Sequence, residues 1–328
     1  MTTRGGAEVD ERTGSASPLG RALVLMGDMW TVRLVRAVFA DQRRFQDLRD
    51  ALAISDPVLS RRLRGLVGDG LLTTREYQLK PPRSEYLLTE AGLDLWRVMV
   101  ALWTWDRTWA GPHHPDAGLR LRHLVCGNST RPVFGCGRCG AIGLTARDVV
   151  GTVDDRLLLD VVSRRSRRSP AMSSPIDAAG VLGDRWSTMI LSDALMGSRR
   201  FHEFEAHLKI SPVTLTQRLG LFVDTGMMTR EAVSAGARRQ EYRLTPKGLD
   251  FFSVSTTLNS WAARWFADDG RSGLSLVHSA CGAELEPQFT CNSCNGVLER
   301  RQIRFEGPGI VAGSQTDDVP SEGTASMA

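Results

Sequence analysis

The sequence predicts a mainly α-helical fold with small β-hairpins (an α+β fold), formed by two copies of one domain. Three observations lead to this prediction. Short motifs recur at a constant spacing in the two halves of the 328 residues. Apolar side chains within each copy recur at intervals of three and four residues, which is typical of α-helices. Each copy also contains two short stretches, rich in Thr, Tyr and Leu, around a polar tip, which is typical of a β-hairpin.

The repeat covers a whole domain. Gly-Asp-Met-Trp at 27–30 returns as Gly-Asp-Arg-Trp at 183–186, and Arg-Arg-Phe at 43–45 returns at 199–201. Each motif recurs after 156 residues. A long period without insertions indicates duplication of one domain and excludes a solenoid of small repeats.

The elements follow the same order in both copies. Short helices come first, and the next helix begins at Ser55 followed by Pro57, or at Ser211 followed by Pro212, which are typical helix starts. A hairpin and a closing helix end each copy. The expected ranges in the first copy are 32–39, 45–52 and 56–67 for helices, 71–88 for the hairpin and 89–105 for one long closing helix. The counterparts in the second copy include a helix at 212–222 and a hairpin at 228–244.

This order is that of a winged helix-turn-helix, whose second helix of the pair enters the DNA major groove. One face of each such helix carries Leu, while the other carries hydroxyl, amide and guanidinium groups that can contact base edges. A solvated helix face is the alternative. The candidate DNA-contacting residues are Ser55, Ser60, Arg61, Arg62, Arg64, Ser211, Thr214, Thr216, Gln217 and Arg218 at the helices, and Lys80, Arg83, Arg238 and Arg239 at the hairpin tips.

The repeated motifs resemble those of the HxlR family of bacterial regulators, relatives of the MarR group. The resemblance rests on Gly-Asp-x-Trp, Arg-Arg-Phe, Glu-Tyr-x-Leu-Thr at 85–89 and 241–245, and Thr-Leu-Thr-Gln-Arg-Leu at 214–219. Members of the family act as homodimers on nearly palindromic DNA. The resemblance therefore implies that this chain is a covalent pseudo-dimer. Because Ser60 and Arg61 stand where Thr216 and Gln217 stand in the second copy, we expect an asymmetric operator.

A Cys/His segment follows each domain. The first contains His123, Cys126, Cys136 and Cys139, and the second contains His278, Cys281, Cys291 and Cys294, with identical spacing. Three thiolates and one imidazole suit a closed structural Zn²⁺ site. We therefore expect each segment to form its own zinc-ribbon-like clip, giving two sites. Three alternatives stay open. The cysteines could be free cytosolic thiols, the segments could have lost the metal while keeping their function, or the thiols could form a redox or metal-sensing switch.

The chain is expected to divide into seven parts. The Ser/Arg/Pro-rich stretch between the halves, with arginines at 164, 165, 167 and 168, is either a solvated linker or an added phosphate contact. The expected parts are a disordered tail (1–17), a winged domain (18–113), a zinc-clip segment (114–150), a basic linker (151–174), a winged domain (175–269), a zinc-clip segment (270–306) and a disordered tail (307–328).

Composition excludes several classes of protein. No stretch approaches the roughly 18–20 apolar residues of a membrane span, and the first residues lack the apolar region of a signal peptide, so we expect a cytoplasmic protein without a membrane partner. No phosphate-binding loop or nucleophile–base–acid set indicates an enzyme. A net charge of +4 permits double-stranded DNA as a partner.

The leading interpretation is a sequence-specific DNA-binding transcriptional regulator. Two other interpretations stay open. The first is a sensor regulator responding to a small-molecule effector or to oxidants. The second is a protein-interaction module in which one winged domain no longer contacts DNA. Association of two chains into a homodimer is also left open.

Overall fold

The computed structural model describes residues 18–80, 82–112, 114, 117–153, 177–232, 239–267 and 273–307. The expected tail 1–17, most of the tail 307–328, the linker arginines and Arg238 lie outside these residues. Residues 151–153, expected in the linker, belong to a strand.

The first half begins with the elements of a winged helix-turn-helix and continues into the strands of the Cys/His segment. Its elements are α1 (Pro18–Met26), α2 (Met29–Phe39), α3 (Phe45–Leu52), α4 (Asp56–Gly68), β1 (Leu72–Leu79), β2 (Pro82–Leu88), α5 (Glu90–Asp94), α6 (Trp96–Trp109), β3 (Arg120–His123), β4 (Ser129–Thr130), β5 (Pro132–Cys136) and β6 (Val149–Val153).

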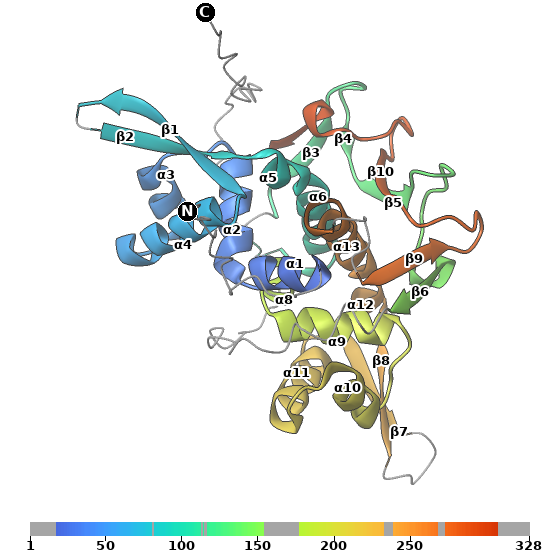
Figure 1. The fold of residues 1–328 in the computed structure, drawn as a ribbon. Helices are drawn as coiled ribbons and strands as arrows, with labels where there is room; N and C mark the ends of the chain where they lie inside the picture. The colour runs from blue at the N-terminus through green and yellow to red at the C-terminus, as the bar shows by residue number, and fades with distance from the viewer. Residues whose placement is uncertain are drawn as a thin grey trace, which may run out of the picture.

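The second half repeats this order, and the two wings extend outward at opposite ends of the molecule (Figure 1). Its elements are α8 (Ala178–Leu182), α9 (Arg185–Leu195), α10 (Phe201–Leu208), α11 (Pro212–Asp224), β7 (Met228–Ala232), β8 (Gln240–Leu244), α12 (Pro246–Asp250), α13 (Phe252–Phe266), β9 (Leu274–His278), β10 (Pro287–Cys291) and β11 (Ile303–Glu306). The prediction of two winged helix-turn-helix units is confirmed.

The closing helix differs from the prediction, because it is split in two. The short helix α5 ends before α6 begins, and the amide of Leu95 at the junction donates to the carbonyl of Gly92. Gly92 permits this turn to pack closely, since a Cβ atom there would lie 2.3 Å from the carbonyl oxygen of Leu71. Gly248 occupies the equivalent position, 2.3 Å from the oxygen of Met227. The recurrence of this glycine therefore has a steric reason in both halves.

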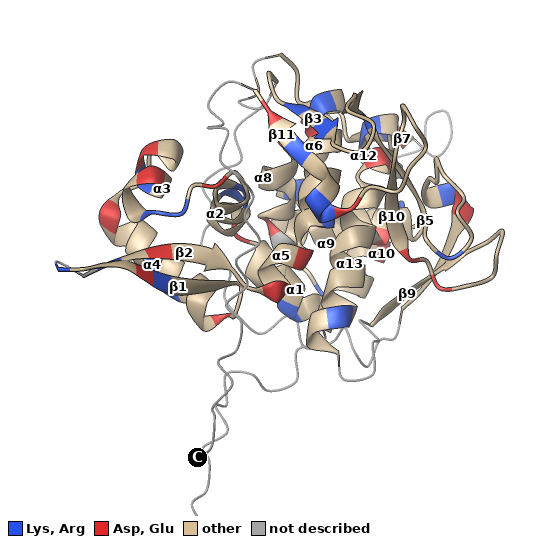
Figure 2. Ribbon diagram, turned by 90° about the horizontal axis from the view of Figure 1, so that it is seen from above, with Lys and Arg blue, Asp and Glu red and all other residues tan. Residues whose placement is uncertain are grey.

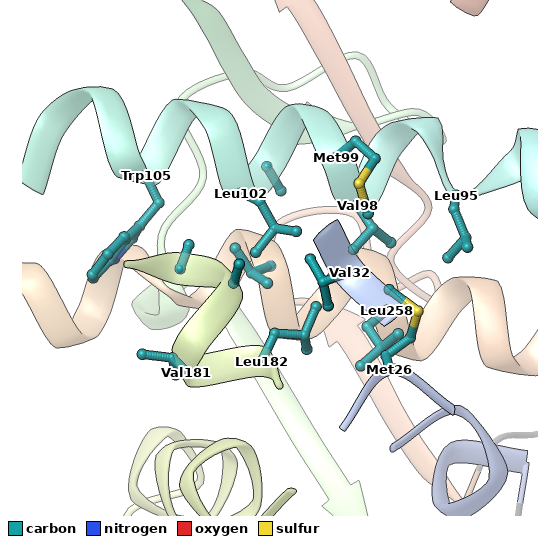
Figure 3. Packing of buried hydrophobic residues seen from close by; sticks show 14 of the residues in the cluster. Met26, Val32, Leu95, Val98, Met99, Leu102, Trp105, Val181, Leu182 and Leu258 are labelled. Carbon is teal, nitrogen blue, oxygen red and sulfur yellow. The ribbon is translucent and has the colours of Figure 1, made fainter. Parts of the chain in front are cut away.

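The two halves share one apolar core instead of folding around separate cores. Figure 3 shows Val32 of α2 and Leu102 of α6 meeting Leu182 of α8 and Leu258 of α13. All four side chains are almost fully buried. Helix α1 lies against α13 of the other half, so the first element of the chain belongs to the central helical layer. Burial of apolar surface thus stabilises the association of the halves as well as each half.

Hydrogen bonds from Trp side chains cross between the halves in reciprocal pairs. The indole of Trp105 donates to the carbonyl of Lys247 at 3.0 Å, and Trp261 donates to the carbonyl of Ala91 at 2.9 Å. The indoles of Trp109 and Trp265 donate to the carboxylates of Asp250 and Asp94 at 2.9 and 2.8 Å. Each bond has its equivalent on the other side, so the halves are related by a pseudo-twofold axis.

Strands of the Cys/His segments also pair across this axis. Strand β5 pairs antiparallel with β10, and Phe134 faces its own counterpart Phe289 in the register, with ring centroids 5.6 Å apart. Strand β3 of the first half pairs with β11 of the second, and β9 of the second half pairs with β6 of the first. The two segments are therefore interleaved, and each sheet formed by their described strands contains strands of both halves.

Candidate nucleic-acid interface and metal centres

Helix α4 presents a basic outer face. Leu59 and Leu63 are fully buried on its inner side, while Arg61 and Arg64 are exposed and Ser60 is half-buried. Ser55 is the N-cap residue, and its side chain makes no capping hydrogen bond. This face leaves two guanidinium groups directed to solvent, where they can donate two hydrogen bonds each to a guanine edge or to phosphate.

Helix α11 presents a neutral outer face. The hydroxyl of Ser211 accepts the amide of Thr214 at 3.2 Å and contacts its hydroxyl at 2.8 Å, so these two residues cap the helix. Thr216 and Gln217 are exposed, although the Thr216 hydroxyl donates to the carbonyl of Pro212. Val213 is 69% exposed at the start of the helix. The equivalent helices therefore differ in charge at their exposed positions.

One half-buried arginine in each helix forms an ion pair within the protein. Arg62 pairs with the carboxylate of Asp28, and the Nε atom of Arg218 lies 2.6 Å from the carboxylate of Asp184. The backbones of Asp28 and Asp184 form a β-bridge with each other across the pseudo-twofold axis. Both aspartates also cap the following helices α2 and α9.

These ion pairs give Arg62 and Arg218 a structural role in positioning α4 and α11. Both side chains are still partly exposed, so their contact with DNA stays a prediction. Sequence reasoning missed Asp28 and Asp184 as their partners. The available signal was an Asp and an Arg that recur together at equivalent positions in both copies.

The wings carry further basic residues. Lys80 and Arg83 are exposed at the outer end of the β1–β2 wing, and Figure 2 shows basic residues there. Arg239 is exposed directly before β8 in the second wing. Nearer the base of the first wing, Arg75 pairs with Glu85 at 2.8 Å, so it is not available as an unpaired cation.

The eight Cys and His residues gather into two groups, but the membership differs from the prediction. One group combines His123 and Cys126 of the first segment with Cys291 and Cys294 of the second. The other combines Cys136 and Cys139 with His278 and Cys281. The prediction that each segment forms its own clip is therefore wrong, because pairing of β5 with β10 brings each Cys-x-x-Cys to the His-x-x-Cys of the other half.

The geometry of each group fits a tetrahedral metal ion. Zinc bonds of about 2.3 Å to sulfur and about 2.0 Å to nitrogen place two sulfurs about 3.8 Å apart and sulfur and nitrogen about 3.5 Å apart. The Nδ1 atom of His123 lies 3.4 Å from the Sγ atoms of Cys126 and Cys294, and the Sγ atoms of Cys126 and Cys291 are 3.9 Å apart. In the other group, Nδ1 of His278 lies 3.4 and 3.3 Å from the Sγ atoms of Cys139 and Cys281.

Hydrogen bonds favour thiolates at the buried cysteines. Burial alone would raise the pKa of Cys291, but the hydroxyl of Thr130 and the amides of Ser293 and Cys294 outweigh this effect and lower the pKa to about 6. At Cys136, amides of Cys139 and Arg138 likewise outweigh burial and lower the pKa. A thiolate is the form that binds a metal, so these donors support ligation. Four protein ligands leave no open position for a substrate, as in structural sites.

Comparisons with known proteins point to one family. The HxlR-like helix-turn-helix family matches residues 25–114 and 181–269, together more than half of the chain. A protein of Mycobacterium tuberculosis named an uncharacterised HTH-type transcriptional regulator is 43% identical over 132 residues, which are 40% of this chain and 82% of the relative. A protein of Synechocystis with the same description is 32% identical over 108 residues, 33% of this chain and 80% of the relative.

Solved structures give two further matches. A candidate transcription factor is 30% identical, with a TM-score of 0.34, covering 38% of this chain and 90% of its own. A second, from Pseudomonas aeruginosa, is 37% identical, with a TM-score of 0.26, covering 32% of this chain and 70% of its own. Among the described residues, none of the helices has both the length and the apolar character required to cross a membrane.

Proposed function

Because this chain belongs to the HxlR-like helix-turn-helix family, we propose that it is a sequence-specific DNA-binding transcriptional regulator and not an enzyme. One chain supplies both halves of a pseudo-dimer. The mycobacterial relative is about half as long as this chain, since the same 132 residues are 40% of one and 82% of the other. Two winged units related by reciprocal contacts support the idea that a single chain does the work of two such relatives.

The observation that carries the proposal is the pair of equivalent helices with different exposed side chains. Helix α4 offers Arg61 and Arg64, whereas α11 offers Thr216 and Gln217 at a face without charge. Arginine favours guanine through its O6 and N7 atoms, and glutamine favours adenine through N6 and N7. The preferred operator is therefore asymmetric, with a guanine-containing half-site for α4 and an adenine-containing half-site for α11.

Contacts to the DNA backbone come from the wings. Lys80 and Arg83 of the first wing and Arg239 of the second are exposed and have the charge to bind phosphate. Arg238 and the linker arginines are further candidates outside the described residues. These contacts add affinity that falls with rising salt but carry little sequence information.

The two Cys₃His groups bind structural Zn²⁺ in this proposal. Each ion would be held by residues of both halves and would fix the interleaved strands β5 and β10. The ions supply no catalysis, because every coordination position is filled by the protein. They act as cross-links that keep the winged units in one relative orientation.

Selection of bound sites from a random DNA pool tests the proposal. The expected result is one asymmetric sequence with unlike half-sites. Two identical inverted half-sites would contradict the asymmetric operator, and failure to enrich any sequence would contradict sequence-specific binding. The pool is then selected again with Arg61→Ala and with Gln217→Ala, and each variant should relax preference in a different half-site. Arg147→Ala, an exposed arginine next to β6 and outside both winged units, is the matched control and should leave the selected sequence unchanged.

Light scattering of the full chain, alone and with DNA, tests the pseudo-dimer. One chain per operator is the expected result. Two chains per operator would indicate a four-winged assembly and contradict the single-chain proposal.

A further inference from the structure

A cavity of about 280 Å³ lies in the second half, between the winged unit and the strands of the interleaved segments. Helices α9 and α13 form two of its walls, and the strands β6 and β9 form the third; Figure 1 shows these four elements next to one another. Most of its lining is apolar. The lining side chains that matter here are Val150, Leu195, Met196, Phe252 and Ser255.

The first half provides an internal comparison for this cavity, because each lining position has an equivalent 154–156 residues away in the sequence. The cavity residues Leu195, Phe252, Ser255 and Ser192 have as their equivalents in the first half Phe39, Trp96, Met99 and Arg36, in that order. Each of these replacements is larger than its counterpart. Met99 and Trp96 are only 4% and 7% exposed, so their bulk fills the interior of the first half.

The strand positions show the same difference. The pairing of β6 with β9 and of β11 with β3 makes Gly151 the equivalent of Phe305. Phe305 packs edge-on against Trp103 at 5.5 Å between centroids. In the second half, Met196 lies over Gly151, where a Cβ atom would be only 2.3 Å from its sulfur. Ala40 is the equivalent of Met196, so a flexible thioether covers the site where the first half has a rigid ring.

One polar atom beside this cavity lacks a partner among the described residues. The Oγ atom of Ser255 is buried and makes no hydrogen bond. The neighbouring hydroxyl of Thr256 donates to the carbonyl of Phe252 at 2.7 Å and is thus satisfied within the helix. An unpaired buried hydroxyl is unfavourable. Rotation of the Ser255 side chain toward the cavity would give this hydroxyl a partner on a bound molecule.

We propose that the cavity is a binding site for a small, largely apolar molecule that carries one hydroxyl or carbonyl group for Ser255. A dry protein cavity of about 150 Å³ accommodates benzene, so a volume of about 280 Å³ suits a bicyclic ring system. The side chain of Met196, 36% exposed, can move to admit the molecule. This site goes beyond the proposed DNA-binding function and does not depend on it.

The test titrates the full-length protein with 2-naphthol and with naphthalene in a calorimeter. We expect one saturable 2-naphthol site per chain and weaker binding of naphthalene. Ser255→Ala should reduce 2-naphthol affinity roughly three- to tenfold, the usual range for one hydrogen bond, and leave naphthalene affinity nearly unchanged. Equal loss for both ligands, or no loss for either, would overturn the role of Ser255.

Two variants copy the first half and should fill the cavity. Ser255→Met reproduces Met99, and the double change Gly151→Phe with Met196→Ala reproduces Phe305 and Ala40. Each should abolish saturable binding. Ser253→Met, on the same helix but outside the lining, is the matched control and should bind as the wild type does. If both filling variants keep the native far-ultraviolet circular dichroism and still bind 2-naphthol, the site is refuted, as it is if the wild type shows no saturable binding.

Discussion

The exchange of metal ligands between the halves predicts the zinc content of two double variants. The first, Cys126→Ala with Cys294→Ala, removes two ligands from the same group. The second, Cys126→Ala with Cys139→Ala, removes one ligand from each group, although both cysteines belong to the first segment. Ligand grouping within segments would predict the opposite result for each variant.

The expected stoichiometry follows directly from the two groups. The wild type should hold two zinc ions per chain, the first variant one and the second none. Structural zinc sites bind with about 10–16 kcal/mol, so an intact site stays filled during purification. A site reduced to three ligands or fewer loses enough of this binding free energy to release zinc on dialysis against a chelator.

Mass spectrometric measurement of zinc against protein concentration provides the assay. Near-ultraviolet circular dichroism of the first variant, which keeps the group of Cys136 and His278, shows whether the shared core survives. Zero zinc in the first variant together with one ion in the second would refute the exchange. Such a result would mean that each segment folds its own clip and that the pairing of β5 with β10 is not the native arrangement.

Three further predictions concern stability. Burial of Asp106, opposed by the amide of Ala178 and the charge of Arg36, raises the pKa of its carboxyl to about 7. This pKa lies above the value of about 3.9 in the unfolded chain. The protonated carboxyl of Asp106 therefore stabilises the folded state at low pH, and this contribution is lost as pH rises through 7. Urea unfolding should show the wild type losing about 2 kcal/mol relative to Asp106→Asn between pH 5.5 and pH 8, and parallel pH profiles would contradict this. Gly92→Ala should destabilise the folded protein by about 2–3 kcal/mol, because the new Cβ atom meets the Leu71 oxygen. Gly65→Ala has open space around the new Cβ atom and should stabilise the protein by about 0.5 kcal/mol or more. Similar melting temperatures for the two variants would show that the contact at Gly92 is not restrictive. Asp184→Ala removes a buried carboxylate that pairs with the half-buried Arg218 and caps α9, and it should lower the free energy of unfolding by about 2 kcal/mol. The same change at the more exposed Asp28 should have a smaller effect, and equal losses would argue against burial as the cause.

The winged units were predictable because their signals are local. Ser55 with Pro57 marks the start of α4, and Leu59, Leu63 and Leu66 at helical spacing mark its buried face. The recurrence of Gly92 and Gly248 indicated a second copy. The break at Leu95 was not predictable, since the residues on both sides favour a helix and only the contact with Leu71 determines the turn.

The sequence predicted the ligand types of each candidate metal centre, three cysteines and one histidine, but not which residues share a centre. Cys136-x-x-Cys139 can join His123 or His278 with the same ligand chemistry, so spacing alone cannot distinguish the two. The choice depends on strand pairing between residues more than 150 apart in sequence, such as Phe134 with Phe289. The ion pairs of Arg62 and Arg218 were missed for a related reason, because their partners lie outside their own helices.

The covalent link between the halves has a consequence at low copy number. A regulator made of two separate chains must associate before it can bind, and its active fraction falls as it is diluted. Here, the reciprocal Trp contacts and the shared metal groups form within one chain. The local concentration of one half around the other is then of millimolar order, whatever the cellular concentration. For the proposed single-chain pseudo-dimer, occupancy of the operator should therefore rise with the first power of protein concentration, and a few molecules per cell would all be competent to bind.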